Sequence, residues 1–307
     1  MNAIDTAPLQ RNLRVMGCSS YIVVHGGTPN MLDQAEARLR ELESWWSRFL
    51  PTSDITLANL ANGQPVQVHA DTLAVVSRAL DAWRQTDGRF DITVLPALLE
   101  HGYTHSTVTH AAAPTIPGRR VGMSGMVRVD YDASTLTVPV LSAIDLGGIG
   151  KGMAADIVAE ELVEAGATGA LVNLGGDLSV QGVPADDSSW FLGIEDPRNP
   201  PQHVAMLRLQ AGGVATSGTT IRRWVTDAGT TAHHLIDPSL GTPTASGVVT
   251  ATVLAADAAT AEAFATAAMM LPGEEAMAML ERVHLAGLAV DDRGNVFTTS
   301  TLKDFTV

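Results

Sequence analysis

Helix-type and strand-type hydrophobic patterns follow one another along this chain without the regular strand–helix–strand alternation of a doubly wound fold. Apolar residues spaced three and four apart predict helices at 29–49, 71–83, 153–165 and 258–271. Apolar and β-branched runs bounded by turn residues predict strands at 170–174, 178–180, 190–194, 204–209, 248–254, 285–290 and 296–300, and hairpins at 127–138 and 221–236. This irregular order favours an α+β fold.

The N-terminal segment lacks the apolar core of a signal peptide, because Asp5, Arg11 and Arg14 interrupt it. We expect the first strand to begin in the run Val15-Met16-Gly17-Cys18 and to continue through 20–24. The longest uncharged stretch, 238–256, contains glycine and proline and does not predict a membrane span. The sequence therefore predicts a cytoplasmic protein without a membrane anchor.

Length and charge narrow the possible functions. The 307 residues suit one large domain or two modest ones, and no repeat or low-complexity linker divides them. The formal net charge of −14 argues against a nucleic-acid-binding protein, since neutralising phosphates requires clustered cations. The single cysteine, Cys18, excludes an intrachain disulfide and a cysteine-based zinc site.

A glycine-rich segment, Asp145-Leu-Gly-Gly-Ile-Gly-Lys-Gly152, precedes the helix predicted at 153–165. Converging backbone N–H groups, the helix dipole and the Lys151 charge would together bind a phosphate. The segment differs from a P-loop at both ends and lacks the third glycine of a dinucleotide fingerprint, where Met153 stands. A tight turn that packs a helix against a strand is the alternative interpretation.

Two further segments carry candidate binding residues. Leu174-Gly175-Gly176-Asp177 follows an apolar strand, and paired glycines allow a ligand to approach the backbone closely. An ordinary turn between strands is the alternative. Thr216-Ser217-Gly218 precedes a segment with adjacent histidines, His233 and His234. Since side chains alternate along a strand, one histidine would enter a cleft as a general base and the other would be solvated. The alternative is one packed and one exposed histidine.

Glu262 and Thr266 lie four residues apart on the last predicted helix and so share one face. A carboxylate and a hydroxyl, completed by carbonyl and phosphate oxygens, suit a hard cation such as Mg²⁺. The alternative is a glutamate stabilised by the helix dipole beside an unremarkable threonine. His101, His105 and His110 do not predict a zinc site, because no carboxylate or cysteine completes a ligand set at suitable spacing.

Each signal is weak alone, but their order along the chain resembles that of the ApbE family, the FAD:protein FMN transferases. The similarity rests on the glycine-rich segment, Asn173-Leu-Gly-Gly-Asp177, Thr216-Ser-Gly218, His233-His-Leu-Ile-Asp-Pro238 and Ala261-Glu-Ala-Phe-Ala-Thr-Ala267. It extends upstream to Gly88-Arg-Phe-Asp-Ile-Thr-Val-Leu-Pro96 and Ser53-Asp-Ile-Thr-Leu-Ala-Asn59, and covers about residues 17 to 300.

The resemblance implies a single domain over residues 1–307, with a T-fold-like α+β architecture and a flavin cleft between two lobes. It implies Mg²⁺-dependent transfer of FMN from FAD to a Thr or Ser hydroxyl of a target flavoprotein, with release of AMP. A Mg²⁺-dependent FAD pyrophosphatase and a non-catalytic FAD-binding protein remain as alternatives. The usual aspartate of the family is here Glu262, whose extra methylene moves the carboxylate.

By the same resemblance, His234 is the candidate base, Lys151 meets the pyrophosphate, and the metal is held by Glu262, Thr266 and the main-chain carbonyl of Gly150. The implied FAD-binding residues are Asp145, Gly147, Gly148, Lys151, Gly175, Gly176, Asp177, Thr216, Ser217, Gly218, His234, Ile236 and Asp237.

Overall fold

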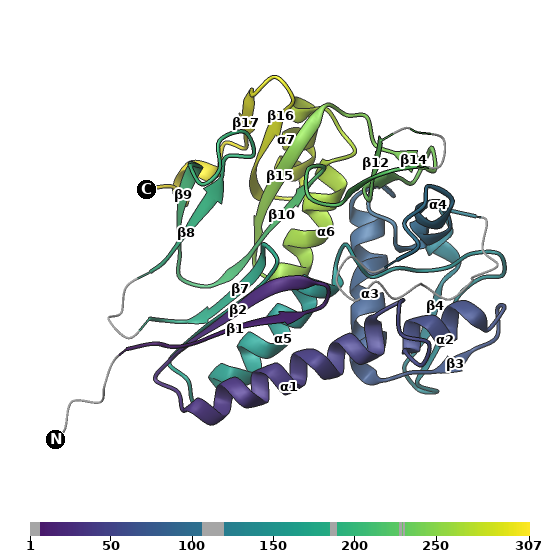
Figure 1. Ribbon diagram of the computed structural model, residues 1–307, viewed down its shortest axis with the longest axis horizontal. Coiled ribbons are helices and arrows are strands. Elements are labelled where there is room, and N and C mark those ends of the chain that lie inside the picture. Colours follow the sequence, from purple (N-terminus) through teal and green to yellow (C-terminus); the bar gives the residue numbers. More distant parts are fainter. Residues whose placement is uncertain (1–6, 106–119, 185–188, 227–228, 230) are drawn as a thin grey trace.

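One sheet of eight strands, antiparallel throughout, organises the protein (Figure 1). The structure is a computed structural model that describes residues 7–105, 120–184, 189–226, 229 and 231–307. In spatial order the strands are β1 (Leu9–Val15), β2 (Cys18–His25), β6 (Gly169–Leu174), β7 (Asp177–Gly182), β10 (Gly212–Gly218), β15 (Val248–Ala255), β16 (Ala286–Asp291) and β17 (Val296–Thr298).

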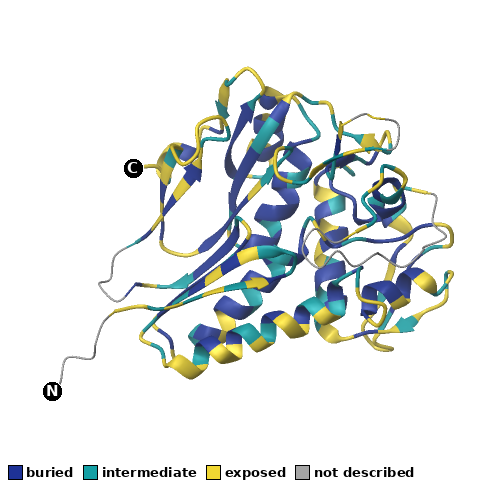
Figure 2. Ribbon diagram, viewed as in Figure 1, coloured by how far each residue is buried: buried dark blue, intermediate teal, exposed yellow. Residues whose placement is uncertain are grey.

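Four helices cover one face of this sheet: α1 (Pro29–Trp46), α5 (Gly150–Glu164), α6 (Ala258–Ala268) and α7 (Gly273–Arg282). Helices α5 and α6 lie directly on the central strands, and α1 packs beside α5 and against β1. Figure 2 shows α6 buried on nearly all sides, which explains why it is rich in alanine. No helix in the described part of the chain is long and apolar enough to cross a lipid bilayer.

The opposite face is covered by a hairpin of β8 (Trp190–Glu195) and β9 (His203–Leu209) and by the 3₁₀ helix η3 (Leu302–Asp304). Along β8, buried Trp190, Leu192 and Ile194 alternate with exposed residues, as expected of a strand with one face on a core. Both faces of the central sheet are therefore buried.

A second group of elements lies beside the helix-covered side of the sheet, to the right in Figure 1. It contains α2 (Asp54–Leu60), α3 (Ala70–Gln85), α4 (Leu95–Glu100), η1 (Ile92–Val94), η2 (Ser124–Met126) and a sheet of β3 (Val66–Gln67), β5 (Thr135–Thr137) and β4 (Arg128–Asp130). Two small hairpins complete it, β11 (Arg223–Val225) with β12 (Thr231–His233) and β13 (Ile236–Asp237) with β14 (Thr242–Pro243). The predicted α+β fold class is confirmed.

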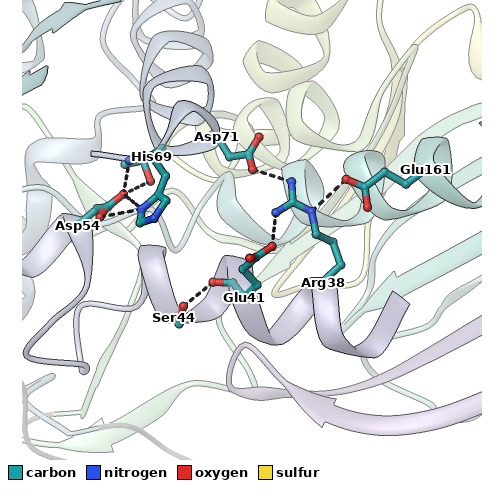
Figure 3. Close-up of polar contacts among 8 residues, drawn as sticks. Arg38, Glu41, Ser44, Asp54, His69, Asp71 and Glu161 are labelled. Atoms are coloured by element: carbon teal, nitrogen blue, oxygen red, sulfur yellow. Dashed lines mark hydrogen bonds and ion pairs between the residues drawn. The ribbon is translucent and has the colours of Figure 1, made fainter. Parts of the chain in front are cut away.

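Ion pairs and hydrogen bonds join the helices of the two groups (Figure 3). The Arg38 guanidinium on α1 pairs with Glu41, with Asp71 on α3 and with Glu161 on α5. Buried Asp54 at the start of α2 accepts hydrogen bonds from the backbone N–H of His69, 2.9 Å away, and from the Thr72 hydroxyl, 2.6 Å away. These contacts fix α3 relative to α1 and α2.

The chain reverses at Met16 and Gly17, where we had expected a continuous strand. Both residues have positive φ, 51° and 71°, as a two-residue type I′ hairpin turn requires. The turn separates β1 from β2, which pair from Leu9 with Val24 to Val15 with Cys18. A positive-φ methionine is uncommon, so the apolar sequence gave no turn signal here except Gly17.

Several helix boundaries differ from those predicted from the sequence, because contacts between distant segments override local sequence preferences. Helix α5 begins at Gly150 rather than Met153, so Lys151 lies in its first turn. Pro272 and Gly273, expected only to stop α6, also begin α7. Helices α2 and α4 and strand β10 were not predicted. The turn expected at 227–229 lies largely outside the described residues.

Close packing of α5 on α6 yields a stability prediction. A Cβ at Gly152 would overlap the backbone carbonyl of Ala258, whereas one at Gly150 would meet only ordinary contacts, at 3.5 Å and beyond. We expect Gly152→Ala to lower the free energy of unfolding by about 1–3 kcal/mol in a urea titration. Gly150→Ala is the matched control, and a Gly152→Ala protein as stable as this control would contradict the packing described.

Candidate active site

A cavity of about 810 Å³ lies where the two groups of elements meet. It is lined by the turn between β1 and β2, the end of α1, the glycine-rich turn, β10 and α6. Its wall includes the following predicted site residues: Asp145, Gly147, Gly148, Gly150, Lys151, Gly175, Asp177, Thr216, Ser217, Gly218, His234, Ile236, Glu262 and Thr266. Gly176 and Asp237 do not line it: Gly176 borders a neighbouring shallow depression, and the Asp237 carboxylate binds the Ser239 N–H in a turn.

The glycine-rich turn is shaped by the two oxygens of the Asp145 carboxylate. Oδ1 accepts the Gly147 N–H at 2.6 Å, and Oδ2 pairs with Nε of Arg48 at 2.6 Å. At Gly148 a Cβ would lie 3.2 Å from the Thr266 hydroxyl oxygen, so the bare backbone allows turn and helix to approach closely. The turn therefore lies close to α6, and α5 begins at the end of the turn.

Three charged side chains meet at the first turn of α5. The Lys151 ammonium pairs with Asp177 at the start of β7 and with Oε1 of Glu262 at 2.5 Å. The other oxygen of Glu262 accepts the Gly152 N–H at 2.8 Å, so a carboxylate from α6 caps the N-terminus of α5. Burial raises the pKa of Glu262 against the opposing effect of Lys151.

Oxygen ligands gather next to this cluster. The hydroxyls of Thr266 and Ser217 lie 3.3 Å apart, and Thr266 follows Glu262 by one helical turn. A single carboxylate with hydroxyls and carbonyls could hold a hard cation that completes its shell with water and substrate phosphates. A cation at Oε1 of Glu262 would replace the Lys151 ammonium there, because both oxygens of that carboxylate are already engaged.

The histidines first considered for zinc are engaged separately. Nε2 of His101 lies 3.1 Å from the Gly241 carbonyl oxygen, and Nδ1 of His105 lies 2.8 Å from the Thr104 hydroxyl. His110 lies outside the described residues. Among the residues that are described, no three His, Cys, Asp or Glu side chains form a metal-binding group.

The two adjacent histidines face different surroundings, but not through strand alternation, because β12 ends at His233 and His234 follows it in a bend. His234 lines the cavity, and burial together with Arg222 and Lys151 lowers its pKa to about 3. The His234 imidazole is therefore neutral at pH 7, as a general base must be. His233 is half-buried rather than solvated, with Nε2 at 3.2 Å from the Thr244 carbonyl oxygen.

The wall residues that carried no predicted role include Cys18, Arg48, Asp91 and Arg222. Arg48 and Asp91 are only 4% and 5% exposed. Their local sequence signal was a charge inside an apolar segment, at Trp45-Trp46-Ser-Arg-Phe49 and at Phe90-Asp-Ile92. Asp91 also lies in an upstream segment that resembles the ApbE family. Such a signal does not reveal which cavity the charge borders, because that depends on how distant segments pack.

The chain matches the ApbE family over residues 16–290. It belongs to the ApbE family. A relative from Vibrio cholerae named FAD:protein FMN transferase is 29% identical over 87% of this chain and 82% of its own length. A relative of the same name from Haemophilus influenzae is 26% identical over 89% of this chain and 82% of its own length.

Solved structures of ApbE proteins share the fold. The ApbE protein of Thermotoga maritima superposes with a TM-score of 0.86 at 26% identity, covering 98% of this chain and all of that one. The flavin transferase ApbE of Vibrio cholerae superposes with a TM-score of 0.80 at 26% identity, covering 97% of this chain and all of that one. The sequence-based assignment to the ApbE family is thereby confirmed.

The low pKa of His234 predicts a pH dependence of stability. Below about pH 6.5, His234 binds a proton in the unfolded chain. In the folded protein, His234 stays neutral until the pH falls to about 3. The free energy of unfolding should therefore fall, by up to about 1.4 kcal/mol per pH unit, as pH drops through this window. Urea titrations at pH 7 and pH 4.5 measure the effect.

The His234→Gln protein should lack this part of the acid sensitivity, while exposed His203→Gln should retain it. Identical acid sensitivity in wild type and His234→Gln would show that His234 is not held neutral by the fold.

Proposed function

We propose that this ApbE-family protein transfers FMN from FAD to a Thr or Ser hydroxyl of a target flavoprotein, with Mg²⁺ and with release of AMP. The proposal rests on one observation above all. The glycine-rich turn, a half-buried lysine, a buried carboxylate with neighbouring hydroxyls, and a neutral histidine line the same cavity. The relatives named FAD:protein FMN transferase support the same reaction.

The pyrophosphate of FAD would bind at the N-terminus of α5. Backbone N–H groups of the glycine-rich turn and the helix dipole favour an anion there, and Lys151 adds a full positive charge. With Asp177 and Glu262 beside it, Lys151 is held at the cavity wall in the absence of substrate. Its ammonium then stabilises negative charge that develops on phosphoryl oxygens.

Glu262, the Thr266 hydroxyl and the Gly150 carbonyl would hold the Mg²⁺ ion. Bound there, Mg²⁺ supplies charge neutralisation on the phosphoryl oxygens and on the AMP leaving group. The all-oxygen character of these groups fits a magnesium site that substrate phosphates complete. Lys151 would exchange its contact with Glu262 for one with the substrate.

His234 would act as the base for the acceptor. The acceptor hydroxyl oxygen forms a bond to the FMN-side phosphorus, its proton passes to His234, and the bond to the bridging oxygen of AMP breaks. A neutral imidazole can accept this proton, and its position on the cavity wall agrees with such a role.

The single domain over residues 1–307 and the cytoplasmic location remain predictions.

Glu262→Gln tests the metal site. The amide keeps the size of the side chain but is a far weaker ligand for a hard cation, so we expect metal-dependent turnover to be abolished. The assay incubates protein with FAD, Mg²⁺ and an acceptor flavoprotein, and follows AMP release and covalent flavin fluorescence on a denaturing gel. Exposed Glu274→Gln is the control. Full activity of Glu262→Gln would remove the metal assignment.

His234→Ala tests the base. We expect transfer to fall by about 10²-fold or more while the Kd for FAD changes little, because the proton acceptor is lost but the phosphate site remains. His203→Ala serves as control. AMP and free FMN formed by the wild type without acceptor would instead indicate a pyrophosphatase, and bound, uncleaved FAD would indicate a non-catalytic binding protein.

A further inference from the structure

Two carboxylates join α5 to α6, and only one of them has a role so far. Glu262 on α6 caps the N-terminus of α5 at Gly152. Asp156 on α5 caps the N-terminus of α6 in return: Oδ1 accepts the Ala258 N–H and Oδ2 accepts the Ala259 N–H, each at 2.9 Å. Each helix therefore supplies, from its second turn, an acceptor for N–H groups of the other helix that have no partner within their own helix.

The first residues of α6 lie in close contact with two neighbouring elements. A Cβ at Gly152 on α5, or at Gly213 on β10, would overlap the backbone of Ala258. The N-cap residue Asp257 accepts the Thr260 N–H at 2.8 Å, which is a contact within the start of α6 itself. Asp156 differs from Asp257 because its carboxylate reaches the N-terminus of α6 from another helix.

Asp156 carries a charge at neutral pH. Burial raises its pKa to about 6, and the hydrogen bonds from the two N–H groups of α6 act in the opposite direction. The ionised carboxylate lies at the positive end of the α6 dipole, and charge-assisted hydrogen bonds are about twice as strong as neutral ones. The contact between Asp156 and α6 is therefore stronger than a cap made by a neutral side chain.

The position of α6 determines where two proposed metal ligands lie. Glu262 and Thr266 follow Ala258 by one and two helical turns, which is about 6 and about 12 Å along the helix axis. The third proposed ligand, the Gly150 carbonyl, belongs to α5. Mg²⁺ requires oxygen ligands at about 2.0–2.1 Å in nearly octahedral geometry, so a shift of α6 along α5 by about 0.5 Å would misplace two ligands relative to the third.

Glu262 alone is poorly suited to hold the two helices in this relation. Its Oε1 pairs with Lys151, and a bound cation would take the place of that ammonium. Asp156 is not part of the cavity wall that the structure describes. A ligand in the cavity therefore does not compete for the Asp156 oxygens, and the contact between Asp156 and α6 can persist when a cation binds.

We propose that Asp156 is a positioning residue for the metal site: by holding the first N–H groups of α6 against α5, it sets where Glu262 and Thr266 lie relative to the Gly150 carbonyl. This inference rests on the proposed function, because it assumes that these three groups bind Mg²⁺. Asp156 acts through α6 and does not contact the ion. Its replacement should weaken metal binding, whereas a cap that only stabilises the helix would leave metal binding unchanged.

Asp156→Asn tests the proposal, because it keeps the size of the side chain but turns an amide NH₂ toward one of the two N–H groups. Mn²⁺ takes the same oxygen ligands as Mg²⁺ and is detected by electron paramagnetic resonance. We expect the Kd of the full-length protein for Mn²⁺ to rise by about tenfold or more. The Mg²⁺ concentration for half-maximal FMN transfer should rise in parallel, while kcat at saturating Mg²⁺ stays within about threefold. The Kd for ADP without metal should stay within about twofold, since the glycine-rich turn is unchanged.

Asp257→Ala is the matched control. It also removes a carboxylate from the N-terminus of α6, but Asp257 bonds to Thr260 within α6 and pairs with Arg78 on α3. Both variants should lower the Tm, by roughly 2–4 °C, and only Asp156→Asn should weaken metal binding. Asp156→Glu is a second variant that keeps the charge but adds a methylene between α5 and the carboxylate. It should raise the Kd for Mn²⁺ by about threefold or more.

A Kd for Mn²⁺ within about twofold of wild type in Asp156→Asn, or in Asp156→Glu should Asp156→Asn not fold, would overturn this inference. An equal loss of metal binding in Asp257→Ala would overturn it as well. If the wild type transfers FMN from FAD with Mg²⁺ in either case, the proposed function stands without it. A wild type that binds no Mn²⁺ and transfers FMN equally well without Mg²⁺ would overturn both the inference and the proposed metal dependence.

Discussion

The contact between Glu262 and the first turn of α5 is the interaction on which the site depends. One carboxylate from α6 caps α5 at Gly152 and pairs with Lys151, which in turn pairs with Asp177 at the start of β7. A helix N-terminus, a second helix and a strand are thus fixed to one another at a single buried point. The chain has only two lysines, and the other, Lys303, lies near the C-terminus.

Burying the charged side chains of this cluster costs free energy, and packing elsewhere in the fold offsets that loss. Two carboxyl groups and one ammonium lie in a cavity wall, where removal from water disfavours their charged forms. The alanine-rich surface of α6 compensates by packing closely against α5 and the sheet. In the proposed reaction, Glu262 would also be the partner of a cation that accompanies the bound diphosphate.

The cavity wall combines groups of two kinds. Lys151, Glu262 and Asp177 neutralise one another and can exchange partners when substrate enters. Arg48 and Asp91 have fixed partners instead: Arg48 contacts Asp145 and the Tyr103 carbonyl oxygen, and Oδ1 of Asp91 accepts hydrogen bonds from Thr93 and Ser124. The first kind would suit reacting phosphates, whose charge changes during the reaction, and the second kind holds the cavity wall in place.

Local sequence determined the hydrophobic periodicity of the helices, the turn glycines and the order of motifs, and these sufficed for the α+β class and the family. The hairpin at Met16, the start of α5 at Gly150 and the whole of α7 depended on contacts with distant segments. Only the tertiary structure brought Arg48 and Asp91 to the cavity that holds Lys151. The physical reason is that propensity and spacing act over a few residues, whereas a buried charge is positioned by partners that lie far away along the chain.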